Sequence, residues 1–344
     1  MNHPPPSENA LIVGAGPIGL ACAISARRRG IDPLVIDAGA VADSIVRFPV
    51  GMTFFTTPER LEIGSHPLVC AGAKATREEA LKYYRGVART EALRVQTYTK
   101  LTWATAEGGG LRCQLETRLG RTELTCQRLI LATGYFGHPN RLGVEGEDLP
   151  HVSHYFDEAH LSYGLNVVVI GGKNSAVEAA LELFRASARV TLVYRGQALP
   201  KSVKYWLRPD FENRVAAGEI AAHLGSEVLR IDPGDVSVRS ADGQELRVPA
   251  DRVYALTGFH PDFELFERLG IQMDPETKRP LIDATTLETN VPGVHLAGST
   301  SAGFRISEVF IENGRFDGEK IFGDAGARAK AGQDYAAINR PKGE

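Results

Sequence analysis

Two stretches of the chain share one pattern of apolar and polar positions. Residues 10–39 read ALIVGAGPIGLACAISARRRGIDPLVIDAG, and residues 166–196 read NVVVIGGKNSAVEAALELFRASARVTLVYRG. Each has an apolar run, a glycine-rich turn, a helical stretch of small residues and a second apolar run, which predicts a strand, a helix and a parallel strand. The turns begin at Gly14 and Gly171, 171 − 14 = 157 residues apart, which predicts two domains of one type.

The remaining apolar segments predict that one domain is inserted into the other. Residues 111–134 predict a hairpin and a buried strand, and residues 252–262 predict a matching strand. A Gly- and Pro-rich crossing follows each of them. Residues 289–322 then predict a strand, a glycine turn and a long helix from about Ile306.

We therefore expect an α/β protein of two Rossmann-like, doubly wound, three-layer domains. The first comprises residues 1–137 and 264–344, and the inserted second domain comprises residues 138–263. The Ala- and Gly-rich tail after about Asp324 is expected to be frayed.

The first glycine turn has the complete GxGxxG pattern of a dinucleotide site, which allows a tight turn, close approach of a pyrophosphate and packing of helix on strand. Asp37 lies 37 − 14 = 23 residues on, at the end of the next strand, where a carboxylate accepts hydrogen bonds from a ribose diol. We predict that this domain binds FAD through Gly14, Gly16, Pro17, Gly19, Asp37, Thr133, Gly134, Gly298 and Ser299.

The second turn predicts a different nucleotide. At the corresponding offset, 195 − 171 = 24, its strand ends in Tyr194-Arg195 instead of an acid. An arginine binds a 2′-phosphate that a carboxylate would repel, so NADPH is favoured, although Arg195 could also be a solvated strand end. The predicted NADPH residues are Gly171, Gly172, Lys173, Asn174, Ser175, Tyr194, Arg195, Lys201 and Lys204.

Two groups of residues are candidates for roles beside the flavin. The helix from Ile306 could direct its positive end at the flavin pyrimidine, or it could simply pack. His151, His154 and Tyr155 could supply a proton, but a structural role for these linker residues is the simpler interpretation. No catalytic residue is therefore assigned.

Composition excludes several other classes of function. Lys and Arg number 39 against 42 Asp and Glu, which gives no reason to expect nucleic acid or a membrane surface as partner. No apolar run approaches the roughly 18 residues of a membrane-spanning helix, and the first ten residues carry no targeting signal. We expect a cytoplasmic protein.

The four cysteines form no CxxC pair and no metal-ligand spacing, so we expect reduced thiols and no metal. A two-residue turn at Leu119-Gly120 would place Cys113 opposite Cys126, since pairs then sum to 239 (113 + 126 = 239).

From about Ala10 to Phe322 the chain resembles the low-molecular-weight thioredoxin reductase-like flavoproteins, and within them the YpdA group of bacillithiol disulfide reductases. The resemblance rests on TFFTTPERLEIG (53–64), HVSHYF (151–156), GGKNSAVEAALEL (171–183), YRG…SVKYWLRPDF (194–211), TGFHPD (257–262) and EVFIENGRFDG (308–318). It implies FAD, NADPH, a homodimer, and a small-molecule disulfide or a small redox protein as electron acceptor.

Three departures concern the thiol chemistry and the flavin. The segment 152–164 lacks the CxxC dithiol of thioredoxin reductases, and Ser299 replaces the family aspartate that contacts the ribitol. The YpdA group has cysteine in GxGPCG, where this chain has Ile18. Cys22 lies one helical turn further on and could substitute, although a buried structural role is the alternative.

The acceptor therefore stays open between a disulfide and a ferredoxin, a quinone or another soluble acceptor. A flavin monooxygenase is a third possibility, but its FxGxxxHxxx(F/Y) pattern is met poorly by VEGEDLPHVSHY, with Val144 for the Phe and His151 one place late. A non-catalytic NADPH or redox sensor is the fourth.

Overall fold

The computed structural model describes residues 5–338 and divides the chain into two compact units. The first contains residues 5–47, 51–138 and 259–338, and the second contains residues 48–50 and 139–258. The inserted segment of the second unit thus runs from residue 139 to residue 258, compared with the 138–263 expected from the sequence. Residues 259–263 join the first unit because the Phe263 ring stacks on His260 at 5.1 Å and meets Phe304 edge-on at 5.3 Å.

The first unit is built on a seven-stranded sheet in the order β3-β2-β1-β6-β5-β4, with β15 also paired to β6. The strands β1, β2, β3, β15 and the end of β6 are parallel, and β4, β5 and β6 form an antiparallel extension. Their bounds are β1 Ser7–Val13, β2 Leu34–Ile36, β3 Arg94–Gln96, β4 Thr99–Glu107, β5 Gly110–Thr117, β6 Gly120–Leu131 and β15 Val294–Leu296.

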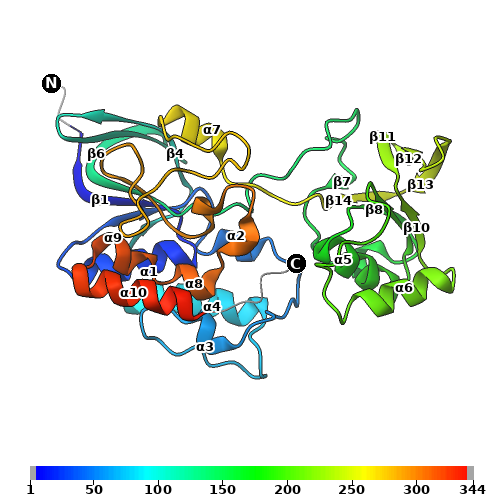
Figure 1. Cartoon of the computed structure of the whole chain (residues 1–344), viewed down its shortest axis with the longest axis horizontal. Coiled ribbons are helices and arrows are strands. Elements are labelled where there is room, and N and C mark those ends of the chain that lie inside the picture. The colour runs from blue at the N-terminus through cyan, green and yellow to red at the C-terminus, as the bar shows by residue number, and fades with distance from the viewer. Residues whose placement is uncertain (1–4, 339–344) are drawn as a thin grey trace. The chain divides into compact units, whose positions relative to one another are not determined.

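Helices cover this sheet, with α1, α9 and α10 lying together on one side in Figure 1. Their bounds are α1 Pro17–Arg27, α2 Asp43–Val46, α3 Pro58–Leu61, α4 Arg77–Thr90, α7 Phe263–Arg268, α8 Ile311–Gly314, α9 Asp317–Phe322 and α10 Ala325–Ala337, with 3-10 turns η2 Gly298–Ala302 and η3 Ile306–Glu308.

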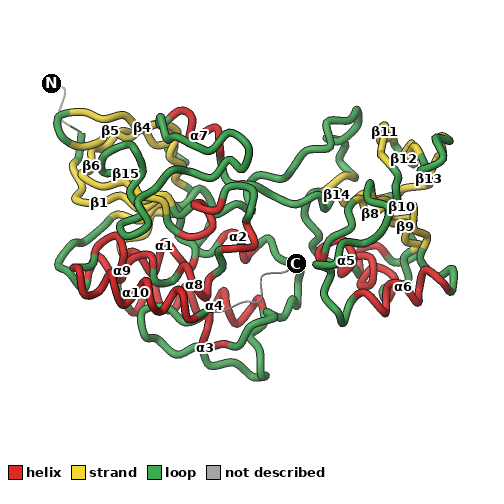
Figure 2. Tube along the Cα trace, viewed as in Figure 1, coloured by secondary structure: helices red, strands yellow, loops and turns green. Residues whose placement is uncertain are grey.

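The second unit has a five-stranded parallel sheet in the order β10-β9-β8-β14-β7 and a three-stranded antiparallel sheet β11-β12-β13. Figure 2 shows the helices of this unit on one side of its strands. The bounds are β7 Val152–Ser153, η1 His160–Ser162, β8 Asn166–Ile170, α5 Asn174–Arg185, β9 Arg189–Tyr194, α6 Arg208–Ala216, β10 Ala221–Leu224, β11 Glu227–Asp232, β12 Gly234–Arg239, β13 Glu245–Ala250 and β14 Arg252–Ala255.

The strand-turn-helix-strand units and the parallel sheets confirm the predicted α/β class. The central parallel strands β1, β8 and β14 bury continuous apolar runs, because both of their faces are covered. In β8, for example, Val167, Val168 and Val169 are wholly buried, and alternate residues enter two separate apolar clusters. No helix within residues 5–338 has the length and apolar character needed to span a membrane.

The predicted register of the Cys113 hairpin is wrong by two residues. Thr117 pairs with Gly120, so Cys113 lies opposite Leu124 and Cys126 lies opposite Leu111. Because a shift of two keeps every side chain on its face, the two thiols remain diagonal neighbours, with their Sγ atoms 3.8 Å apart and both residues buried.

Two expectations for the C-terminal segment are also wrong. The long helix from Ile306 is broken into η3, α8 and α9. The described part of the tail that was expected to fray forms the helix α10, and residues 339–344 lie outside the described residues. Asp324 caps α10 by accepting a hydrogen bond from the Ala327 N–H at 2.9 Å, which explains where this helix begins.

The two crossing segments are hydrogen-bonded to each other. In the first unit the His260 N–H donates to the His138 carbonyl at 2.9 Å. In the second unit the Asn140 N–H donates to the Gly258 carbonyl at 2.9 Å, and the Thr257 hydroxyl donates to the Asn140 carbonyl at 2.5 Å. The inserted unit therefore begins and ends at one place.

Candidate functional site

The first glycine turn joins β1 to α1 and fits a phosphate. Gly14 has φ +111°, and a Cβ there would lie 2.3 Å from the Ala132 oxygen, while a Cβ at Gly19 would lie 1.8 Å from the Gly14 oxygen. A Cβ at Gly16 would meet no atom within 4 Å. No side chain in the described structure caps the first turn of α1, so the N–H groups beside this open space are available to an anion.

Asp37 is held against this turn. Its two carboxylate oxygens accept the Ala15 N–H at 2.7 Å and the Gly39 N–H at 2.8 Å. Burial raises the pKa of Asp37, and the two backbone hydrogen bonds oppose that rise. Each oxygen keeps a further lone pair, which suits a ribose diol.

The other predicted flavin residues come together at the ends of β6 and β15. The Gly134 N–H donates to the Thr300 hydroxyl at 3.2 Å, and a Cβ at Gly134 would lie 3.9 Å from the Ser299 hydroxyl oxygen. Thr133 Oγ1 is buried without a hydrogen-bond partner in residues 5–338. A buried hydroxyl of this kind is an expected contact for a bound polar group.

Asp317, the first residue of α9, holds the backbone at Gly298 in place. Its carboxylate accepts the Gly298 N–H at 2.7 Å, and its side chain is almost wholly buried. Burial raises its pKa to about 6, although the Gly298 hydrogen bond and the Lys320 ammonium oppose that rise. The sequence offered no signal for this role, because Asp317 is 19 positions from Gly298.

The second glycine turn joins β8 to α5. Gly171 has φ +139°, and a Cβ there would lie 2.5 Å from the Leu256 oxygen. The Tyr194 ring lies over Gly172, where a Cβ would be 2.4 Å from the ring. Lys173 stands at the N-cap position of α5, and its side chain makes no capping hydrogen bond. Lys173 and Ser175 are both exposed. Because β8 and β9 are parallel, Tyr194 and Arg195 emerge at the same edge as this turn.

Arg195 differs from the other arginines of the second unit. Within residues 139–258 each of the others has a hydrogen bond or ion pair with the protein, whereas exposed Arg195 has none in the described structure. Lys173 and Lys201 likewise form no ion pair there. An edge with unpaired cations and an uncapped helix start is suited to a phosphate.

Asn174 holds the loop that carries the remaining cations. Its amide N–H donates to the Ser202 carbonyl at 3.2 Å, and its side-chain oxygen accepts the Lys204 N–H at 2.8 Å. The loop of Lys201 and Lys204 therefore lies beside the start of α5. Sequence spacing alone had no means of placing it there.

Residues 11–298 match the family described as pyridine nucleotide-disulphide oxidoreductase. The chain belongs to this family. Bacilliredoxin reductase Bdr of Bacillus subtilis (strain 168) is 43% identical over 321 residues, covering 93% of this chain and 98% of that protein. Ferredoxin–NADP reductase of Ignicoccus hospitalis is 32% identical over 300 residues, covering 85% of this chain and 89% of that one.

Solved structures of related proteins have the same fold. Bacillithiol disulfide reductase Bdr (YpdA) from Bacillus cereus has a TM-score of 0.89 and 40% identity, covering 95% of this chain and 99% of that chain. Thioredoxin reductase of T. acidophilum, at 19% identity and a TM-score of 0.71, shares the fold. These comparisons confirm the predicted resemblance and a flavin-dependent oxidoreductase that uses FAD and NADPH. Bound FAD supplies the acceptor for a hydride and passes electrons onward.

The oxidoreductase has no exposed thiol at the start of α1. Cβ atoms at Gly298 and Gly314 would lie 3.1 Å and 3.0 Å from the Ile18 side chain, so Ile18 packs between these two glycines. Cys22 is fully buried against α9, where a Cβ at Gly318 would lie 2.8 Å from the Cys22 Cα. Burial, with Asp317 and Glu319 nearby, raises the pKa of Cys22, so it is a poor nucleophile.

His151 and His154 contact other residues of the second unit. His154 Nδ1 lies 3.2 Å from the Ala255 carbonyl oxygen, and its Nε2 lies 3.4 Å from a Glu147 oxygen. The Tyr155 N–H donates to the Ser153 hydroxyl at 3.0 Å. His151 Nε2 is buried without a hydrogen-bond partner among residues 5–338.

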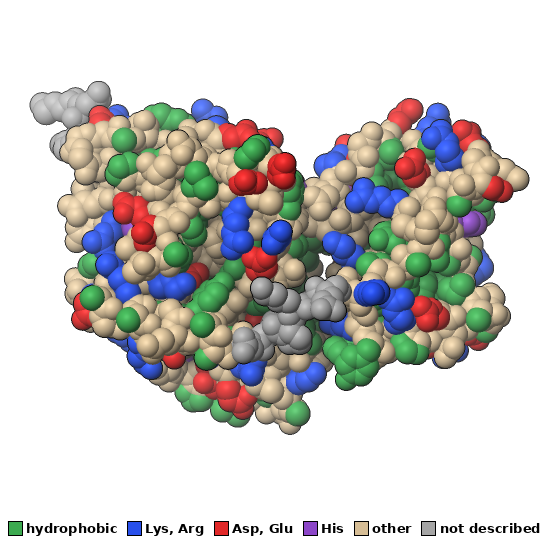
Figure 3. All heavy atoms as spheres, in the orientation of Figure 1, with side chains coloured by type: hydrophobic (Ala, Val, Ile, Leu, Met, Phe, Trp, Pro, Cys, Tyr) green, Lys and Arg blue, Asp and Glu red, His purple; other side chains and the backbone are tan. Residues whose placement is uncertain are grey.

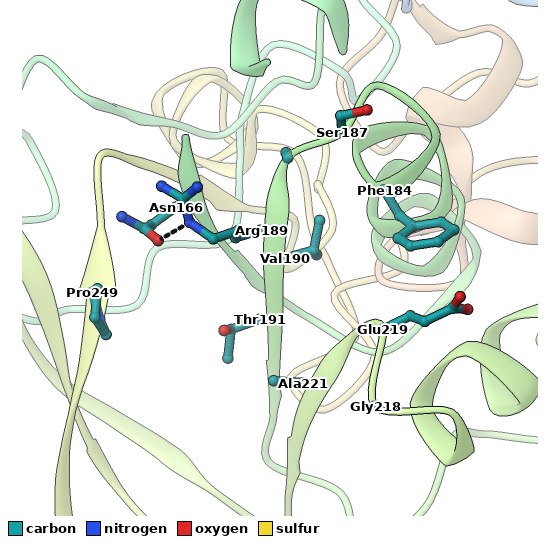
Figure 4. Close-up of a pocket in the computed structure, with 11 residues that line it drawn as sticks. Asn166, Phe184, Ser187, Arg189, Val190, Thr191, Gly218, Glu219, Ala221 and Pro249 are labelled. Carbon is teal, nitrogen blue, oxygen red and sulfur yellow. Dashed lines mark hydrogen bonds between the residues drawn. The ribbon is translucent and has the colours of Figure 1, made fainter. Parts of the chain in front are cut away.

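A surface hollow of about 490 Å³ lies at the amino ends of β8 and β9 in the five-stranded sheet of the second unit (Figure 4). Asn166 and Arg189, which begin β8 and β9, are hydrogen-bonded at 2.8 Å on its wall. Nucleotides bind at the carboxyl ends of such strands, so this hollow is separate from the candidate nucleotide site. Figure 3 shows charges of both signs mixed over the visible face, in keeping with the near-balanced composition.

Proposed function

We propose that this oxidoreductase uses NADPH to reduce a low-molecular-weight disulfide of the bacillithiol disulfide class. The observation that carries the proposal is the near-complete alignment with the two Bdr proteins. In addition, each unit has a glycine turn that leads into a helix whose first N–H groups have no side-chain cap. The reaction balances as one disulfide, one NADPH and one proton giving two thiols and NADP⁺. The electron pair leaves the nicotinamide as hydride and reaches the disulfide through the flavin.

The two units have separate roles in this proposal. The first unit holds FAD, with Gly16 open to the pyrophosphate, Asp37 on the ribose diol, and Thr133 and Ser299 at the flavin end. The second unit holds NADPH, with Lys173 and the start of α5 at the pyrophosphate and Arg195 at the 2′-phosphate. We further propose a cytoplasmic homodimer. Light scattering at twice the chain mass would support the dimer, and a value of one chain mass would contradict it.

Disulfide reduction in this chain proceeds without a protein thiol at position 18. Ile18 forms no mixed disulfide, and Cys22 is buried with a raised pKa. In this proposal the substrate disulfide receives its electrons directly from the reduced flavin.

The absence of that thiol also favours a second candidate. Ferredoxin–NADP reductase of Ignicoccus hospitalis, a relative over most of both chains, is named for an acceptor that is not a disulfide. We keep a one-electron acceptor of the ferredoxin kind as the alternative.

One experiment separates the two candidates. The protein is reduced anaerobically with NADPH and mixed in a stopped-flow instrument with bacillithiol disulfide, other small disulfides, ferredoxin or a quinone. Fast flavin reoxidation by bacillithiol disulfide in wild type and in Cys22→Ser supports direct disulfide reduction. Turnover that Cys22→Ser abolishes would make Cys22 the relay. If ferredoxin alone reoxidises wild type, while Ile18→Cys gains disulfide turnover, the acceptor is not a disulfide.

A further inference from the structure

The loop between β9 and α6 presents aromatic rings to solvent beside the second glycine turn. It is anchored from within by Leu199, Val203 and Leu207, which are buried in the core of the second unit. Between these anchors Tyr205 is 83% exposed and Trp206 is 50% exposed. The loop is therefore fixed in place although two of its largest side chains face outward.

The aromatic pair is ordered and close to positive charge. The Tyr205 and Trp206 rings meet edge-on at 4.9 Å, and the Lys204 ammonium lies 5.2 Å from the Trp206 ring. Lys201 is exposed on the same loop. Asn174, the first residue of α5, clamps the loop through Ser202 and Lys204, so the rings lie next to the helix start that suits a phosphate.

This combination selects the chemistry of a ligand. Neighbouring exposed aromatic rings form a contiguous apolar patch, and such a patch on a protein surface indicates a binding site. Aromatic rings bind the flat face of a nucleobase, and the side chains of lysine and arginine bind phosphate groups. A ligand with both features is an adenosine that carries a phosphate on its ribose.

We propose that Tyr205 and Trp206 form the adenine subsite of the second unit, and that Asn174 is a positioning residue that holds this subsite against the phosphate-binding turn. The adenine stacks on the ring pair while Arg195, Lys201 and Lys204 meet the 2′-phosphate. The inference rests on the proposed NADPH site and adds to it the residues that recognise the base.

The test uses 2′,5′-ADP, which carries the adenine and the 2′-phosphate without the nicotinamide. Trp103 and Trp206 are the two tryptophans of the chain. In FAD-loaded Trp103→Phe protein, 2′,5′-ADP is expected to change the emission of Trp206. By calorimetry, Tyr205→Ala and Trp206→Ala should each weaken 2′,5′-ADP binding about tenfold, equivalent to about 1.4 kcal/mol.

Two further variants sharpen the result. Tyr163→Ala is the matched control, because Tyr163 is 73% exposed in the same unit. The dissociation constant of this variant for 2′,5′-ADP should stay at the wild-type value. Asn174→Ala should weaken 2′,5′-ADP binding by releasing the loop. The loss should be larger for 2′,5′-ADP than for nicotinamide mononucleotide, a selectivity that general destabilisation of the unit would not produce.

Other outcomes would overturn the inference. Unchanged affinity in Tyr205→Ala and Trp206→Ala, with NADPH still reducing the flavin normally, would remove the adenine subsite and leave the proposed function standing. If these variants instead raise only the KM of a protein acceptor, the rings belong to a docking surface. Failure of NADPH to bind or reduce the wild-type protein would overturn the proposed function itself.

Discussion

Replacement of Asp317 by asparagine should stabilise the protein, because the ionised carboxylate is buried at a cost. Asp317 lies at the start of α9 with 3% of its surface exposed, and its pKa is raised from 3.8 to about 6. The unfolded chain ionises near 3.8, so stability is fully present below that pH and is lost as the pH rises through about 6.

The size of the effect follows from the two pKa values. At 1.36 kcal/mol per pH unit, the difference amounts to about 3 kcal/mol at pH 7 and about 1 kcal/mol at pH 4.5. Asparagine is neutral, and its side-chain oxygen still accepts the Gly298 N–H. Asp317→Asn should therefore be more stable than wild type by up to these amounts, with the gap closing as the pH falls.

The assay is urea unfolding in a Trp206→Phe background, where Trp103 alone reports on the first unit. Measurement at two FAD concentrations separates a change in flavin affinity from a change in stability. Glu319→Gln is the control on the same helix. Burial raises the pKa of Glu319, but hydrogen bonds from Arg29 and Ser25 outweigh it and leave that pKa lowered, so this variant should lose stability at pH 7. A gap for Asp317→Asn that is absent at pH 7, or independent of pH, would refute the reasoning.

Three further predictions concern the cofactor turns and the thiols. Arg195→Ala should weaken NADPH binding roughly 10- to 150-fold, or about 1.5–3 kcal/mol, while NADH binding changes little; equal losses for both would show that Arg195 does not contact the 2′-phosphate. Gly16→Ala should fold but lose FAD affinity in a flavin titration, whereas Gly19→Ala, whose Cβ would lie 1.8 Å from the Gly14 oxygen, should fail to fold stably. Native protein should release one equivalent of thionitrobenzoate from Ellman's reagent, from partly exposed Cys70, and four after denaturation; fast reaction of a second thiol would contradict the burial of the other three.

The sequence was informative where the constraint is local. Glycine is required at positions 14 and 171 because φ is positive there and a backbone oxygen lies where a Cβ would be. The turn pattern alone therefore located both glycine turns. The alternation of apolar residues likewise placed Cys113 and Cys126 on one face of one hairpin. It could not give the register, because turns at 118–119 and 119–120 differ by a shift that leaves both faces unchanged.

Features made by distant residues were not predictable. The segment after Ile306 is interrupted where Gly314 and Gly318 pack against Ile18 and Cys22 of α1, a contact that no local propensity encodes. The same holds for the clamp formed by Asn174. A motif match marks Asn174 as part of a nucleotide turn, but only the fold shows its side chain engaged with the loop that follows β9.

The hydrogen bonds between the crossing segments hold the two ends of the inserted segment close together. Because His138 is bonded to His260, the two ends left by excising residues 139–259 already lie within one hydrogen bond of each other. A short turn can close that gap with little entropic cost. We therefore expect that a protein with a short turn in place of the inserted segment would keep the seven-stranded sheet of the first unit intact.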